Sequence, residues 1–168
     1  IGMDQGRDEL LYGSVKGKNP FKDVRVRRAL YQAVDIETIK TKLMNNQAFP
    51  TGAVVPSSKG SFNDPEIEKR LPYDVAVAKK LMADAGYPSG FEVTLDCPNN
   101  RYINDEELCI ALAGMWAQLK IKVKVSAQPL LVGVEREIDT ALDLVRREVL
   151  NRELPTIAAS AYLAEVSK

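Results

Sequence analysis

The side chains best suited to bind a small molecule lie in one short segment, Cys97–Asp105, with the sequence CPNNRYIND. Arg101 can form a bidentate pair with a carboxylate, and the Tyr102 ring offers an apolar wall with a polar tip. The asparagine amides beside them can hydrogen-bond a peptide main chain. We therefore predict a ligand-binding loop made of Asn99, Asn100, Arg101, Tyr102 and Asn104.

The same segment also fits a purely structural role. Asparagines are common turn and helix-cap residues, so the amides can serve the backbone of the loop itself. Arg101 can then pair with Asp105 or Glu106 on the following helix. The sequence leaves both interpretations open.

The segment lies where a strand is predicted to end and a helix to begin. Residues 91–97 alternate between apolar and polar side chains, as do residues 121–127, which is typical of half-buried strands. Between them, Asn104 and Glu107 form a capping-box pattern before a helix with the apolar face Leu108, Ala111, Leu112, Met115 and Leu119. Strand, helix and strand predict a parallel βαβ unit, and ligands of such sheets gather at the carboxyl ends of strands.

Another helix is predicted to begin at Asp23, whose carboxylate can accept the free backbone N–H groups of the first turn. Its apolar residues recur with helical spacing, so one face is expected to be buried: Val26, Ala29, Leu30 and Ala33. Arg25, Arg28 and Gln32 fall on the opposite side, where we predict a solvated face.

The remaining segments complete an α/β fold. Asp35 begins a helix that ends at Asn45 and Asn46, and Asp74 begins one that Gly86 ends. The rest is predicted as a strand at 8–15, a covering loop at 47–73, a helix at 135–150 and a strand at 156–164. The fold class predicted is a mixed sheet with a parallel βαβ unit and packed helices.

Composition excludes several classes of function. Basic and acidic side chains each number 23, so no net field draws the chain to nucleic acid. Histidine is absent, which removes the most common general base and imidazole metal ligand. The serines lack a nucleophile elbow, and the adjacent carboxylates do not face one another. We predict no catalytic residue, no metal and no cofactor.

The cysteines, Cys97 and Cys109, are twelve positions apart and lack the C-x-x-C spacing of zinc or redox sites. If Cys97 ends a strand and Cys109 lies in the next helix, their Cα atoms can approach the ~5.5 Å that a disulfide requires. A disulfide and a pair of buried thiols both remain possible.

Several blocks follow one another in a fixed order: NPFKDVRVRRALYQAVD from Asn19, YD with AKKLM from Tyr73, AGYP from Ala85 and GFEV from Gly90. Together they resemble the oligopeptide and dipeptide-type solute-binding proteins of ABC transporters. The resemblance implies a lobe of a periplasmic binding protein-like fold, which holds a peptide or other small solute for a membrane permease. It also implies a place outside the cytoplasmic membrane, where a disulfide persists.

The resemblance implies one lobe, 1–168, with a main body at 1–129, a shortened join at 130–134 and a C-terminal helix and strand at 135–168. A segment that carries a Gly-Trp and acidic pocket motif in the similar proteins is missing after Pro129. We therefore expect this chain alone to bind solute weakly or not at all. The alternative is a lobe that acts as an interaction or structural module and binds no solute of its own.

Overall fold

The structure is a computed structural model that describes residues 1–52 and 69–130. Contacts divide the chain into two units, Ile1–Gln128 and Pro129–Lys168, beside the predicted join. The helix predicted at 135–150 and the strand predicted at 156–164 lie outside the described residues. The described ends of the predicted covering loop, 47–52 and 69–73, contain neither helix nor strand.

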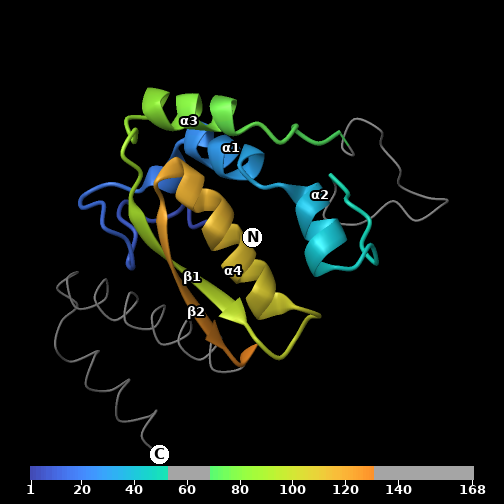
Figure 1. Cartoon of the computed structure of the whole chain (residues 1–168). Coiled ribbons are helices and arrows are strands. Elements are labelled where there is room, and N and C mark those ends of the chain that lie inside the picture. The colour runs from blue at the N-terminus through green and yellow to red at the C-terminus, as the bar shows by residue number, and fades with distance from the viewer. Residues whose placement is uncertain (53–68, 131–168) are drawn as a thin grey trace, which may run out of the picture. The chain divides into compact units, whose positions relative to one another are not determined.

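The first unit combines helices with a short sheet. In chain order its elements are η1 (Pro20–Lys22), α1 (Val24–Gln32), α2 (Ile36–Thr38), the π-helical turn η2 (Ile39–Leu43), α3 (Val75–Asp84), β1 (Glu92–Pro98), α4 (Asp105–Trp116), η3 (Ala117–Leu119) and β2 (Lys122–Gln128). Helices α1 and α3 lie side by side, and α4 packs on the sheet (Figure 1). The predicted α/β fold is confirmed.

Strands β1 and β2 are parallel and joined through α4, as the βαβ prediction requires. Their register runs from Glu92 opposite Lys122 to Pro98 opposite Gln128. Gly90 sets the start of this register, because it has a φ of +67° and a Cβ there would lie 2.1 Å from the Lys120 carbonyl oxygen. Only glycine permits this approach, so the turn into β1 packs directly against the turn into β2.

The strand predicted at 8–15 is wrong. Gly13 forms a single antiparallel bridge with Val93 instead of a ladder. The Glu92 N–H donates to the Ser14 hydroxyl at 2.8 Å. In a regular ladder this N–H would donate to a backbone carbonyl of the neighbouring strand. The side chain thus competes with strand pairing.

Three aspartates begin helices as predicted. The carboxylate of Asp23 accepts from Arg25 N at 2.8 Å, that of Asp35 from Thr38 N at 3.0 Å, and that of Asp74 from Val77 N at 2.9 Å. The helix after Asp35 widens into the π-helical turn η2 and ends where two asparagines adopt positive φ, at Asn45 and Asn46.

The polar residues of the block at Asn19–Asp35 hold the unit together. The buried Asn19 amide donates to the Asp4 and Arg7 carbonyl oxygens, each at 2.9 Å. The Arg25 guanidinium forms an ion pair with the Asp23 carboxylate. It also donates to the Asp84 carbonyl, at the end of α3, at 2.7 Å. Arg25 is exposed, as predicted, and its bond to Asp84 also links α1 to α3.

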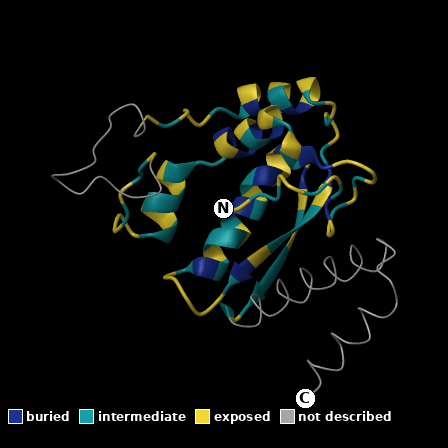
Figure 2. Ribbon diagram, turned by 180° about the vertical axis from the view of Figure 1, so that it is seen from behind, coloured by how far each residue is buried: buried dark blue, intermediate teal, exposed yellow. Residues whose placement is uncertain are grey.

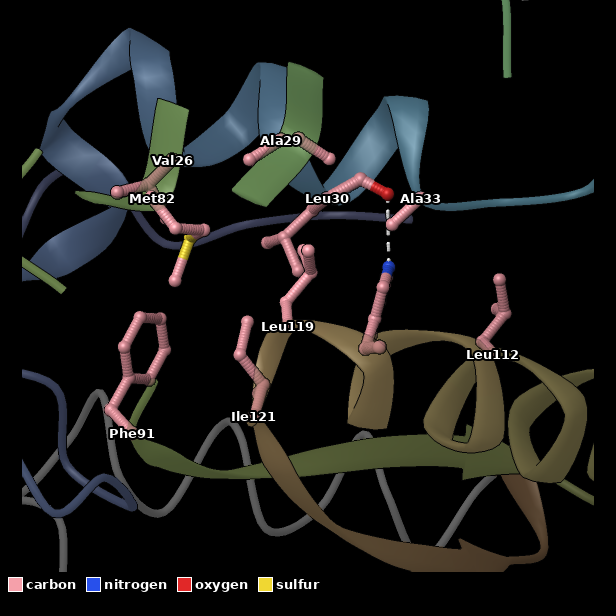
Figure 3. Close-up of a cluster of buried hydrophobic side chains, with 11 residues drawn as sticks. Val26, Ala29, Leu30, Ala33, Met82, Phe91, Leu112, Leu119 and Ile121 are labelled. Carbon is pink, nitrogen blue, oxygen red and sulfur yellow. Dashed lines mark hydrogen bonds between the residues drawn. The ribbon is translucent and has the colours of Figure 1, made fainter. Parts of the chain in front are cut away.

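The core lies between the inner faces of α1 and α3 and those of α4 and the sheet (Figure 3). Its members come from every described layer: Val26, Ala29, Leu30, Ala33, Ala78, Met82, Phe91, Leu112, Trp116, Leu119 and Ile121. The buried positions of Figure 2 accordingly fall on the inward sides of the helices, while their outward sides are exposed. The apolar stripe predicted for α1 is confirmed.

The C-terminal carbonyl groups of α1 find partners on two other helices. Val34 N bonds to Tyr31 O, so the Leu30 carbonyl loses its usual partner and accepts the Trp116 indole N–H at 3.0 Å (dashed line in Figure 3). The Gln32 carbonyl accepts Asp74 N at 2.9 Å. The prediction of a solvated Gln32 is wrong, because its side chain is buried and donates to the Pro72 carbonyl at 3.3 Å.

We expect Trp116→Phe to destabilise the chain, because the ring stays apolar while the buried Leu30 carbonyl loses its donor. The loss in free energy of unfolding should be roughly 1–3 kcal/mol. Urea denaturation followed by far-UV circular dichroism measures it. Ile110→Ala on the exposed side of the same helix is the control and should change stability by less than about 0.5 kcal/mol. Equal stability of Trp116→Phe and the wild type would contradict the role of this hydrogen bond.

Candidate functional site

The predicted ligand loop joins the carboxyl end of β1 to the first turn of α4. Asn99 N donates to the Gln128 carbonyl at 3.2 Å, which ties the start of the loop to the end of β2. Beyond this point Asn99, Asn100, Arg101 and Tyr102 are exposed, and Asn104 is partly buried. The loop therefore presents polar side chains at the strand ends where α/β proteins bind ligands.

The side chains of Arg101 and Tyr102 contact one another on the loop. The Arg101 Nε donates to the Tyr102 hydroxyl at 2.9 Å, and the guanidinium carbon lies 5.2 Å from the centroid of the same ring. Tyr102 is 63 % exposed and the adjacent Ile103 is 78 % exposed. The pair presents a cation, a phenol and an apolar neighbour on one small surface.

Asp105 organises the backbone that carries this pair. Its Oδ2 accepts the backbone N–H of Arg101 at 3.0 Å and that of Tyr102 at 3.1 Å, and its Oδ1 accepts that of Glu106 at 3.0 Å. The Asp105 residue is only 8 % exposed. The hydrogen bond from Arg101 N, with those from Tyr102 N and Glu106 N, holds the pKa of the Asp105 carboxyl below its usual value, against the opposing effect of desolvation.

The capping box predicted for Asn104 and Glu107 is wrong. Asn104 has a φ of +56°, in the left-handed region, and its side chain makes no cap hydrogen bond. Its amide donates instead to the Leu43 carbonyl at 2.9 Å, at the end of η2. Asparagine tolerates this backbone conformation better than most residues, so it can join the loop to the π-helical turn.

Cys97 and Cys109 form a disulfide, with their Cα atoms 6.6 Å apart. Cys97 lies near the end of β1 and Cys109 on the second turn of α4. The predicted alternative of two buried thiols is excluded. The bond links β1, before the loop, to α4, after it, so the whole loop is part of a covalently closed segment.

The structural interpretation of the loop holds only in part. The Arg101 guanidinium bonds to Tyr102, while it is the Arg101 backbone that bonds to Asp105. Sequence reasoning considered Asp105 only as an ion-pair partner and missed its backbone contacts. The available signal was an aspartate in the first helical turn, where carboxylates commonly accept free N–H groups.

Two hollows lie elsewhere in the first unit. A shallow groove of ≈ 420 Å³ runs along Tyr12–Ser14, Glu92–Thr94 and Lys122–Lys124, at the amino ends of the strands. A small apolar cavity of ≈ 50 Å³ lies under the N-terminal residues, against Phe91 and Trp116. Neither hollow includes the predicted loop.

The described residues contain neither a membrane-spanning helix nor a cluster of metal-ligating side chains. No helix among them is both long and apolar enough to cross a membrane. Within the same residues, no three His, Cys, Asp or Glu side chains are grouped so that they could hold a metal ion.

Residues 3–161 match the family model described as bacterial extracellular solute-binding proteins, family 5 Middle. The chain belongs to this family. Among curated members, the probable deoxycholate-binding periplasmic protein of Escherichia coli K12 is 37 % identical over 101 residues, which cover 59 % of this chain and 19 % of the relative. The chain thus spans about a fifth of the length of that relative.

Solved structures agree with the family assignment. AgaA of A. tumefaciens R10, in complex with agropinic acid, is 32 % identical with a TM-score of 0.57, and covers 66 % of this chain and 22 % of its own. The murein tripeptide binding protein of Escherichia coli is 27 % identical with a TM-score of 0.57, and covers 74 % of this chain and 26 % of its own. The family 5 chain therefore matches part of a periplasmic binding protein-like fold, as the sequence predicts, and both of these relatives are named as binding proteins.

We expect Asp105 to make stability depend on pH in the acidic range. Its folded-state pKa is depressed, so its contribution is complete above an unfolded pKa of about 3.9 and is lost as the pH falls through the folded value. Asp105→Asn removes this dependence. Urea denaturation between about pH 5 and pH 2 should therefore show a smaller loss of stability for the variant than for the wild type.

The amide protons of Arg101 and Tyr102 provide a local check of the same titration. Their NMR shifts should move with the protonation of Asp105 in the wild type and lose that component in Asp105→Asn. Identical pH profiles of stability and of these shifts in both proteins would contradict the assignment.

Proposed function

We propose that this chain supplies one ligand-binding surface of a solute-binding component that serves an ABC-type peptide import system. The observation that carries the proposal is the exposed Arg101–Tyr102 pair, held at the carboxyl end of β1 in a member of this family. The partners would be a peptide or other small solute and the membrane permease that receives it. The place of action would be the periplasm or the outer side of the cytoplasmic membrane.

The chemistry of the pair fits a solute with a carboxylate. Nε of Arg101 is engaged by Tyr102, while the terminal Nη groups make no hydrogen bond to the described residues. A guanidinium in this state can donate two parallel bonds to a carboxylate, such as the C-terminus of a peptide. The loop amides of Asn99 and Asn100 lie on the same segment and would contact the peptide main chain.

The proposed mechanism involves no covalent step. A solute-binding component encloses its ligand, usually by closure of two lobes, and releases it to the permease. In the proposed assembly this chain contributes one lobe, 1–168, and a single lobe would bind weakly because it contacts only one side of the solute. Asn104 would serve this site indirectly, since its amide is committed to Leu43.

The proposal predicts weak binding of a free peptide at the loop. Titration of the ¹⁵N-labelled chain with Ala-Ala-Ala should shift the amide signals of residues 99–104, with a Kd near ~1 mM, which corresponds to roughly −4 kcal/mol. Arg101→Ala should weaken binding about tenfold or more, because a charge-assisted hydrogen bond is worth roughly 1.5–3 kcal/mol. Arg28→Ala, which removes an exposed arginine on α1, is the matched control and should leave the Kd unchanged.

Ala-Ala-Ala with a C-terminal amide tests whether the peptide carboxylate is needed for binding. The wild type should bind this amide as weakly as Arg101→Ala binds the free acid. Shifts confined to the groove at Tyr12–Ser14 would place the site elsewhere. No shift at any residue in millimolar peptide would reject solute binding by this chain and favour an interaction or structural module.

A further inference from the structure

We propose that Asp105 and the Cys97–Cys109 disulfide are positioning groups, which hold the Arg101–Tyr102 pair in the orientation that meets the ligand. For its ligand-binding part this inference rests on the proposed function. Neither group needs to touch the solute. Both act on the backbone and on the ends of the loop that carries the pair.

The first argument is the arrangement of the loop around Asp105. Two consecutive backbone N–H groups, those of Arg101 and Tyr102, converge on the single oxygen Oδ2. Consecutive N–H groups that converge in this way form a concave site for an anion. Here the anion is a side chain of the protein itself, so the site is already occupied. A ligand carboxylate would therefore bind the Arg101 guanidinium rather than these N–H groups.

The second argument is the geometry of α4. Asp105 and Cys109 are separated by four positions on this helix, so they lie on the same face, one turn apart. Asp105 holds the middle of the loop, and the disulfide fixes Cys109 to Cys97, where β1 ends. The loop is thus attached to the same helix face at two consecutive turns.

A third attachment joins the loop to η2. Asn104, in its left-handed conformation, donates to the Leu43 carbonyl of η2, 61 positions away in the sequence. With Asn99 bonded to Gln128, the two ends and the middle of the loop are all fixed, while the side chains of Arg101 and Tyr102 remain exposed. Such a loop loses little conformational entropy when it binds, which favours affinity.

The positioning role is testable without any ligand. In the wild type, the Arg101 Nε–H should give a slowly exchanging NMR signal, and its δ-methylene protons should be shifted by the Tyr102 ring. Asp105→Ala should move both signals toward those of the exposed Arg28. Asp74→Ala is the matched control, because it removes a carboxylate that begins α3 by accepting from Val77 N and should leave both Arg101 signals unchanged.

Asp105→Asn is a milder variant in case the alanine protein does not fold. The asparagine side chain has one carbonyl oxygen, which can accept either from the Arg101 and Tyr102 N–H groups or from the Glu106 N–H. Its NH₂ group then faces the remaining N–H donor, and two donors cannot form a hydrogen bond with each other. We therefore expect two slowly or rapidly exchanging loop states, or signals intermediate between those of the wild type and Asp105→Ala. Reduction of the disulfide, and the double variant Cys97→Ser/Cys109→Ser, should broaden or shift the same Arg101 signals.

The ligand measurement uses Ala-Ala-Ala and a double-mutant cycle. Asp105→Ala should weaken binding roughly three- to tenfold, because part of the loop must then be ordered on binding. In an Arg101→Ala background, the same change should have little further effect, since its path to the ligand is already removed. Asp74→Ala should leave the Kd unchanged even if it lowers the midpoint of unfolding as much as Asp105→Ala does.

Unaltered Arg101 signals in Asp105→Ala, in Asp105→Asn and in the reduced protein would overturn the inference. Fully additive effects of Asp105→Ala and Arg101→Ala on the Kd would also overturn it, because Asp105 would then act independently of Arg101. If the wild type binds no peptide, the proposed function fails, while the NMR signals of Arg101 still decide whether Asp105 and the disulfide position the pair.

Discussion

The hydrogen bond from the Trp116 indole to the Leu30 carbonyl joins the end of α4 to the end of α1. Trp116 is 4 % exposed, and its ring belongs to the cluster that also holds Leu119 and Ile121. Because a buried carbonyl without a donor is costly, this bond fixes where α4 crosses α1. The rest of the unit depends on that placement, since the loop at 99–104 precedes α4 and α4 leads through η3 into β2.

Different residues of this chain stabilise the fold and form the proposed ligand surface. Three polar side chains of the Asn19–Asp35 block bond to backbone groups or to one another: those of Asn19, Asp23 and Arg25. They hold the N-terminal segment, α1 and α3 together and lie in a different part of the chain from the loop. The exposed pair at Arg101 and Tyr102 instead sits on a loop fixed by a carboxylate, a disulfide and an amide. A rigid support under exposed, chemically varied side chains suits a family that binds different solutes.

Local patterns predicted much of this architecture. Helix starts, apolar stripes and strand alternation depend on neighbours within a few residues. The strands β1 and β2 therefore lie within one residue of their predicted bounds, and α1, α3 and α4 begin directly after the predicted residues. The predictions that failed depend on distant partners. The Ser14 hydroxyl meets Glu92 across 78 positions, Gln32 reaches Pro72 across 40, and Asn104 reaches Leu43 across 61. The spacing of residues within one helix or strand cannot predict contacts between such distant positions.

By itself, the sequence determined the fold class, the family resemblance and the segment with the chemistry of a ligand site. It could do so because periodicity, capping and family motifs are written in consecutive residues. Only the tertiary structure decided between a disulfide and two thiols, because that choice depends on how β1 approaches α4. It also decided that Asp105 binds the loop backbone while the Arg101 guanidinium stays with Tyr102. Those choices are made by distances between atoms, and a sequence specifies such distances only through the packed core that brings the segments together.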